Sequence, residues 1–178
     1  TEGLDPQHIT ASNIALLLDS VRYHAGDIRL TLRDGSLDER SGLAIATVSG
    51  YVHIDSTAVS VSECTLQTAR SYIELQAHVP WAALSEQPTA DLQAEWAATI
   101  DGQDVLTAMG EQSPKLMHAC PDTTLFISGL IEGNMNRLRV HDLTGVLPGV
   151  FTLEAYGTME QLMDDRRRSG QVYARLQT

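Results

Sequence analysis

The chain has 178 residues, an apolar fraction of 43% and a formal net charge of −11 at pH 7. This length suits a single domain over residues 1–178 that buries about 70% of its unfolded surface without a disulfide or a metal ion. The acidic charge argues against nucleic acid and anionic membranes as partners, because both select cationic surfaces. No apolar run approaches the ~20 residues that a membrane-spanning helix needs.

Motifs that signal catalysis or cofactor binding are missing from the sequence. It contains no Gly-rich phosphate loop, no G-x-S-x-G, no H-E-x-x-H and no paired C-x-x-C. No cofactor is therefore expected, and the sequence favours a non-catalytic role over an enzyme.

The first predicted element is a helix that follows a loose lead-in over residues 1–9. Ile14, Leu17, Leu18 and Val21 fall at i, i+3, i+4 and i+7, which is the spacing of one apolar helical stripe. Thr10 or Ser12 can cap this N-terminal helix, and Gly26 ends it.

Alternating apolar and polar residues then predict a series of strands. Residues 27–33 alternate with a period of two, and residues 43–55, 59–61 and 71–79 continue as extended segments. Gly50 interrupts the second of these segments and indicates a bulge or a bend.

Two hairpins are predicted in the middle of the chain. Asp101-Gly102 lies between the alternating segments 94–100 and 103–109, and Asp-Gly in that setting is a strong hairpin signal. Residues 110–123 are expected to form a loop with a short turn. Residues 125–131 and 137–143 form the second hairpin, around Glu132-Gly133-Asn134.

A C-terminal helix is expected from Thr152, its cap, to about Arg168, with Gly170 closing it and a last strand over 171–176. The predicted fold class is α+β: a large, mostly antiparallel sheet of about seven to nine strands, flanked by an N-terminal helix and a C-terminal helix. Such a sheet is large enough to curl or to close into a barrel.

His53 and Asp55 form the sharpest candidate for a metal site. Residues i and i+2 of a strand share a face, and a distant histidine, His141 or His118, could complete a two-His-one-carboxylate set. The alternative is a polar row on a solvated strand face, with His53 bonded to a cross-strand partner.

A second catalytic candidate pairs His118 with Cys120 in the loop between Pro114 and Pro121. A nucleophilic thiol also needs a depressed pKa and an orienting group, which the sequence does not reveal. Cys64 and Cys120 are otherwise interpreted as two small buried residues of a reducing compartment, with one disulfide as the alternative.

The remaining candidates are residues that could contact a partner protein. Arg166, Arg167 and Arg168 form the only basic run, and in the last turn of a helix they would offset the helix dipole. A phosphate or a partner carboxylate is the alternative ligand for this run. Trp81 and Trp96 are expected in the core, with an interaction surface or a ligand pocket as the alternative.

Three function classes follow from these observations. The first is an assembly or protein-interaction subunit of a larger particle, such as a virion or a multi-subunit complex, that uses strand edges to bind protein partners or itself. The second is a small-molecule-binding domain with its pocket in a curled sheet, and the third is a metal-dependent or cysteine-dependent enzyme. The expected location is the cytoplasm or an assembled particle, with export after removal of a leader as the alternative.

Overall fold

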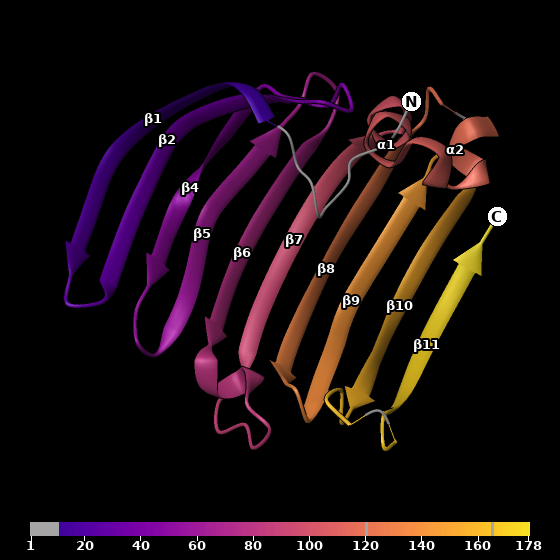
Figure 1. The fold of residues 1–178 in the computed structure, drawn as a ribbon. Helices are drawn as coiled ribbons and strands as arrows, with labels where there is room; N and C mark the ends of the chain where they lie inside the picture. The colour runs from indigo at the N-terminus through magenta and orange to yellow at the C-terminus, as the bar shows by residue number, and fades with distance from the viewer. Residues whose placement is uncertain (1–10, 120, 165) are drawn as a thin grey trace.

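The computed structural model describes residues 11–119, 121–164 and 166–178, and eleven strands join in one open antiparallel sheet (Figure 1). The strands are β1 (Ala11–His24), β2 (Asp27–Glu39), β3 (Ala44–Ile45), β4 (Thr47–Ile54), β5 (Ala58–Gln67), β6 (Tyr72–Pro80), β7 (Leu92–Asp101), β8 (Thr124–Asn134), β9 (Arg137–Leu147), β10 (Phe151–Glu160) and β11 (Ser169–Gln177). The short helical segments are η1 (Trp81–Leu84), α1 (Gly102–Met109), η2 (Gly110–Gln112) and α2 (Lys115–Ala119).

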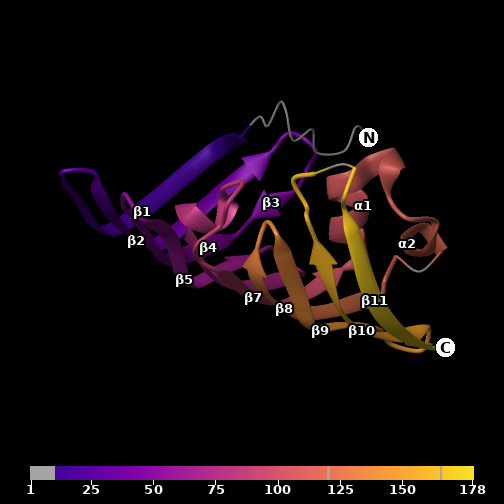
Figure 2. The ribbon, with the colours of Figure 1, turned by 90° about the horizontal axis from the view of Figure 1, so that it is seen from below.

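The sheet is a meander in which each strand lies beside its neighbours in the sequence. The order is β1-β2-β4-β5-β6-β7-β8-β9-β10-β11, with β3 paired to β2 outside this path. The predicted α+β class with about seven to nine strands is wrong, because only short helical segments accompany the eleven strands. Of the two shapes that the sequence allowed, the sheet curls but does not close into a barrel, because β1 and β11 each pair with only one strand of the described sheet. The curvature instead produces an open, concave sheet (Figure 2).

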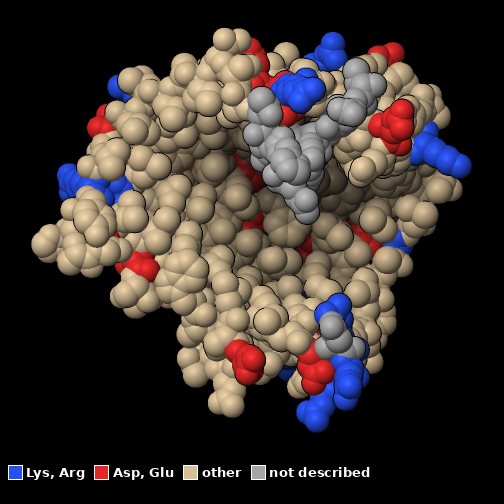
Figure 3. Space-filling model, viewed as in Figure 1, with Lys and Arg blue, Asp and Glu red and all other residues tan. Residues whose placement is uncertain are grey.

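One face of the sheet is apolar across all its strands and the other is polar. On β6, β7 and β8 the residues that share the apolar face are Ile73, Leu75, Ala77, Ala94, Trp96, Ala98, Ile127, Gly129 and Ile131. Their neighbours, such as Glu74, Gln76 and Glu95, lie exposed on the opposite face. The apolar face is the concave one, and Figure 3 shows it hollowed, with charged side chains mainly at its rim.

The predicted N-terminal helix is wrong, because Ala11–His24 is strand β1, paired with β2. The reason lies in the irregularities of this pair, where the register shifts between Leu17 and Leu18 and between Leu18 and Ser20. A bulge inserts an extra residue, so Leu18 and Val21 stand opposite Leu32 and Leu30 on one face although they are three positions apart. A bulged strand has therefore imitated the spacing of a helical stripe.

The predicted C-terminal helix is also wrong. Phe151–Glu160 is strand β10, paired with β9 and β11, and Leu153, Ala155, Gly157 and Met159 share one of its faces. A turn with left-handed backbone at Gln161 follows. The pairing available on both sides of β10 outweighed the helical propensity of this segment.

The hairpin predicted around Asp101-Gly102 is wrong in its second half. Residues 92–101 form strand β7, but the Asp101 carboxylate accepts a hydrogen bond from the backbone N–H of Gln103 at 2.9 Å and thereby caps α1. The aspartate of the Asp-Gly pair thus begins a helix instead of closing a turn.

Several other predictions are confirmed. Strands cover 27–33, 72–79 and 171–176, and the β4–β5 register shifts at Gly50. The second hairpin pairs β8 with β9, although β8 extends to Asn134 and the chain reverses at 135–136, after the predicted turn. The segment 110–123, predicted as a loop with a short turn, instead holds the short helical segments η2 and α2. The predicted lead-in over residues 1–9 lies outside the described residues.

The core of the molecule is small for a chain of this length. Ala83 of η1 packs with Leu92 and Leu138 at one end of the concave face, and Met135 and Leu162 from adjacent turns lie against them. Trp96 crosses Gly129 so closely that a Cβ atom at Gly129 would overlap its ring. In the part of the chain that the structure describes, no helix is long and apolar enough to cross a membrane.

Candidate functional site: an open sheet edge and a concave apolar face

The chain exposes more surface than a compact protein of its mass. Its accessible surface is 11706 Å², whereas a folded monomer of 19.4 kDa is expected to expose roughly 8,500 Å². The difference of roughly 3,000 Å² is as large as the area buried in stable protein complexes. It reflects the open shape, because ten strands line one concave layer and the described residues form no second layer that covers them along its length.

Strand β11 forms one free edge of the sheet. All nine of its residues are exposed, with Val172, Tyr173 and Leu176 retaining 64%, 57% and 61% of their accessible surface. It pairs with β10 over its full length without a register shift, so its outer row of backbone groups is regular. Within the described residues no other strand pairs with this row.

Strand β1 forms the opposite edge and is equally exposed, but it is irregular. Leu16, Val21 and Tyr23 lie on its concave face and are more than half exposed. The register shifts three times along the β1–β2 pair, and Asn13 has a left-handed backbone. Bulges of this kind hinder the addition of a further strand.

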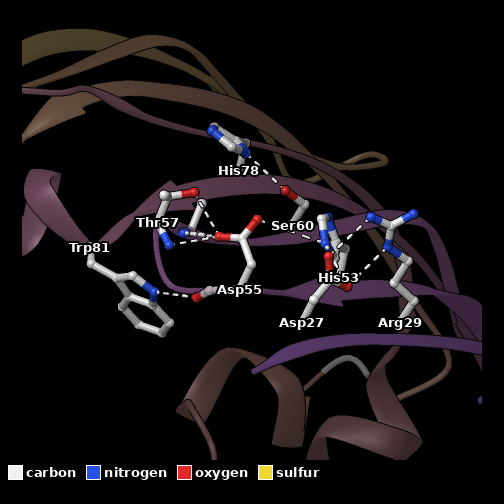
Figure 4. Close-up of polar contacts among 9 residues, drawn as sticks. Asp27, Arg29, His53, Asp55, Thr57, Ser60, His78 and Trp81 are labelled. Atoms are coloured by element: carbon white, nitrogen blue, oxygen red, sulfur yellow. Dashed lines mark hydrogen bonds and ion pairs between the residues drawn. The ribbon is translucent and has the colours of Figure 1, made fainter. Parts of the chain in front are cut away.

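His53 and Asp55 lie at the same end of β4, as their spacing predicted (Figure 4). The His53 Nε2 atom is 3.3 Å from Asp27 Oδ1 and 3.7 Å from Asp55 Oδ2, in geometries that form no hydrogen bond. The guanidinium of Arg29 donates two hydrogen bonds of 3.0 Å to Asp27. Chiefly for that reason the pKa of Asp27 is lowered, with His53 adding a smaller effect.

Asp55 is occupied by the turn between β4 and β5. Its Oδ1 accepts hydrogen bonds from the Thr57 hydroxyl at 2.6 Å, the Thr57 N–H at 2.7 Å and the Ala58 N–H at 2.9 Å. These bonds, first of all the one from the Thr57 hydroxyl, lower the pKa of Asp55 to about 2. Oδ1 of Asp55 is thus occupied by three hydrogen bonds that hold the turn between β4 and β5.

The histidine expected to complete a metal site lies elsewhere. His141 is on β9, where its Nε2 is 3.0 Å from Glu132 Oε2 of β8. Among the described residues no group of three His, Cys, Asp or Glu side chains is arranged to hold a metal ion. The structure therefore brings together His53 and Asp55, with Asp27, but does not bring His141 to them.

Of the candidate pair His118 and Cys120, the structure describes only His118. His118 is exposed on the five-residue helix α2, and Cys120 lies outside the described residues. Cys64 is a half-buried free thiol on β5, against the bulge at Gly50. No catalytic geometry for a thiol can be assembled from the described residues.

The proposed interaction anchors fall at three separate places. Trp81 begins η1, is partly exposed and donates an indole hydrogen bond of 2.9 Å to the Asp55 carbonyl. Trp96 is a partly buried residue of the concave face on β7. The run Arg166–Arg168 lies in the exposed turn that leads into β11, so its predicted role at a helix end is wrong.

Sequence reasoning identified the final strand but missed its importance as an edge. The alternation of Val172, Ala174 and Leu176 predicts a strand, but an edge is defined by the strand order. The absence of lysine and proline from 169–177 was the available signal, since both protect natural edges. The chain matches no protein-family model, no curated protein and no solved structure, so the site is interpreted from its geometry alone.

Proposed function

We propose that this protein is a non-catalytic assembly subunit that binds protein partners through the open β11 edge of its sheet. The observation that carries the proposal is β11: nine exposed residues, regular pairing on one side and no described strand on the other. A partner strand placed there gains a continuous row of backbone hydrogen bonds, which is how proteins recognise one another by strand addition.

The composition of β11 supports this role. Arg175 is its only charged residue, and the strand contains neither a proline nor a bulge. Natural edge strands that must stay single use charges, prolines and bulges to prevent pairing. The bulged strand β1 has such protection, whereas β11 does not.

The surface area of the molecule also supports assembly. Roughly 3,000 Å² of excess exposure matches the interfaces of permanent complexes, and large hydrophobic side chains such as Leu16, Val21 and Leu176 are exposed. Surfaces of this size and polarity are typical of subunits that are covered by a neighbour.

Native mass spectrometry of the purified protein, alone and with Val172→Lys, tests the proposal. We expect a defined multimer without additional non-protein mass, and we expect the lysine on β11 to reduce its population. Gln76→Lys is the matched control, because Gln76 is exposed on the outer face of an interior strand. A multimer that withstands Val172→Lys as well as it withstands Gln76→Lys would contradict an edge-based assembly.

A second candidate function is the binding of an elongated apolar small molecule along the concave face. It is favoured by one observation, the apolar surface on which Leu75 lies beside Trp96, and Ile73, Ala98 and Ile127 lie side by side across three strands. Trp96 would report such binding through its fluorescence, and Trp96→Phe would remove the signal. A monomer that carries non-protein mass in the spectrum would favour this candidate over assembly.

A further inference from the structure

We infer that the partner of β11 is the β11 strand of a second copy, joined antiparallel about a two-fold axis perpendicular to the sheet. This inference rests on the proposed function and specifies the partner. Two-fold dimers are the commonest protein assemblies, and their interfaces must be self-complementary. The sequence and register of β11 meet that requirement.

Symmetry restricts the register of such a pair. In an antiparallel pair, two residues that lie opposite each other share a face of the sheet. In a symmetric pair with both apolar faces on the same side, opposite residues must therefore both have even numbers or both have odd numbers. Pairing centred on Tyr173 satisfies this condition and uses all nine residues of the strand. Shifting either strand by one residue would place Val172 opposite Tyr173 of the other copy and force the two faces apart.

The central register pairs compatible side chains on both faces. On the concave face Val172 lies opposite Ala174 of the second copy, and Gly170 lies opposite Leu176. On the outer face Gln171 lies opposite Arg175, which keeps the two arginines of the dimer apart. A register centred on Arg175 would instead oppose like charges, which destabilises a strand pair.

Tyr173 makes the centre of this interface aromatic. Its ring already stacks on Tyr156 of β10, with centroids 5.2 Å apart and an interplanar angle of 20°. In the dimer, the two Tyr173 side chains are directly opposite, so the stack extends across the axis. Aromatic pairs of this kind are among the stabilising cross-strand contacts of sheets.

Charge also favours this edge for self-association. Residues 151–178 contain four acidic and four basic residues, whereas the whole chain carries a net charge of −11. The β10–β11 edge is therefore electrically neutral in an acidic protein, and two copies meet there with the least repulsion. The bulged edge at β1 lacks the regular backbone that a two-fold pairing needs.

Charge exchange at Gln171 tests the register. Sedimentation equilibrium of the full chain should show a reversible dimer. Gln171→Arg, which opposes Arg175 twice in each dimer, should raise the dissociation constant by about two- to thirtyfold. Adding Arg175→Glu to Gln171→Arg should restore the dimer, while Arg175→Glu alone and the control Gln76→Arg should not tighten it.

Disulfide trapping tests the symmetry axis. In a background with Cys64→Ser and Cys120→Ser, Tyr173→Cys should cross-link under mild oxidation, because opposite residues lie about 4.5–5.5 Å apart between their Cα atoms. Arg175→Cys should not, because the two copies of that residue would be more than about 13 Å apart. Circular dichroism of each variant shows whether it has folded.

Three outcomes would overturn the inference. A monomer at all concentrations excludes self-pairing, and if that monomer binds another protein through β11 the proposed function survives without it. A dimer that is insensitive to Gln171→Arg contradicts the register. A dimer trapped by Val21→Cys and not by Tyr173→Cys places the contact at β1.

Discussion

At the scale of single residues, Asp55 shows how a turn between two long strands is held. Three hydrogen-bond donors from Thr57 and Ala58 converge on one of its carboxylate oxygens, and its main-chain carbonyl accepts a hydrogen bond from the indole N–H of Trp81. Because Asp55 has this many hydrogen-bond partners within the turn, we interpret it as a residue that stabilises the fold rather than as a metal ligand.

The lowered pKa of Asp55 predicts a pH-dependent effect of its removal. The folded pKa of about 2 lies below the ordinary value of 3.8, so the carboxylate stabilises the fold above about pH 4 and this contribution is lost as the pH falls toward 2. Asp55→Ala should therefore lower the melting temperature most at neutral pH, and its difference from the wild type should shrink between about pH 5 and pH 2.5.

Thermal unfolding of both proteins over this pH range checks the prediction. Glu86→Ala serves as the control, because Glu86 is exposed in the loop after η1. A difference between wild type and Asp55→Ala that stays constant with pH would show that the turn does not depend on the charge of Asp55.

At the scale of elements, α1 is attached to the sheet through a buried polar cluster. The Asp104 carboxylate accepts hydrogen bonds from the hydroxyls of Thr68 and Ser71, and the Ser71 bond is 2.6 Å long. Thr68 and Ser71 are buried in the β5–β6 turn, and Ser71 Oγ also accepts the N–H of Asp101. One carboxylate thus links the helix to the turn between two strands.

Removing this carboxylate should loosen both elements at once. Asp104→Ala leaves two buried hydroxyls without their acceptor, so we expect a loss of about 1–3 kcal/mol in the free energy of unfolding. Denaturant unfolding measures the loss, and hydrogen exchange should show faster exchange in α1 and in the β5–β6 turn. Asp122→Ala, at an exposed position, should have little effect, and equal losses in the two variants would contradict this role.

At the scale of the whole molecule, the sheet resembles a one-dimensional array. Among the described residues, each interior strand of the main path pairs only with its two neighbours, except β2, which also pairs with β3. The small helical segments lie at the ends of the strands. Stability in such an architecture is approximately a sum over neighbouring units, so the ends of the array open most easily.

This arrangement predicts a gradient of amide exchange. Under conditions that keep the protein monomeric, protection should be highest in β6–β8 and lowest in β1 and β11. If the dimer forms as inferred, raising the protein concentration should slow exchange in β11 and leave β1 unchanged. Uniform protection from edge to edge would show instead that the sheet opens only as a whole.

Local sequence patterns determined most of the strands. The strands in 27–33, 72–79 and 171–176, the pairing of the second hairpin and the irregularity at Gly50 were all predicted, because burial of one face imposes a period of two on the side chains. His53 and Asp55 were likewise placed together by their spacing on one strand.

The tertiary structure decided what local patterns leave ambiguous. Leu18 and Val21 have helical spacing in the sequence, and only pairing with β2 shows that a bulge produces it. Residues 151–160 became a strand because β9 and β11 were available on either side. Strand order determined that the sheet stays open and that β11 is an edge, because an edge depends on which strands pair and not on the residues of one strand alone.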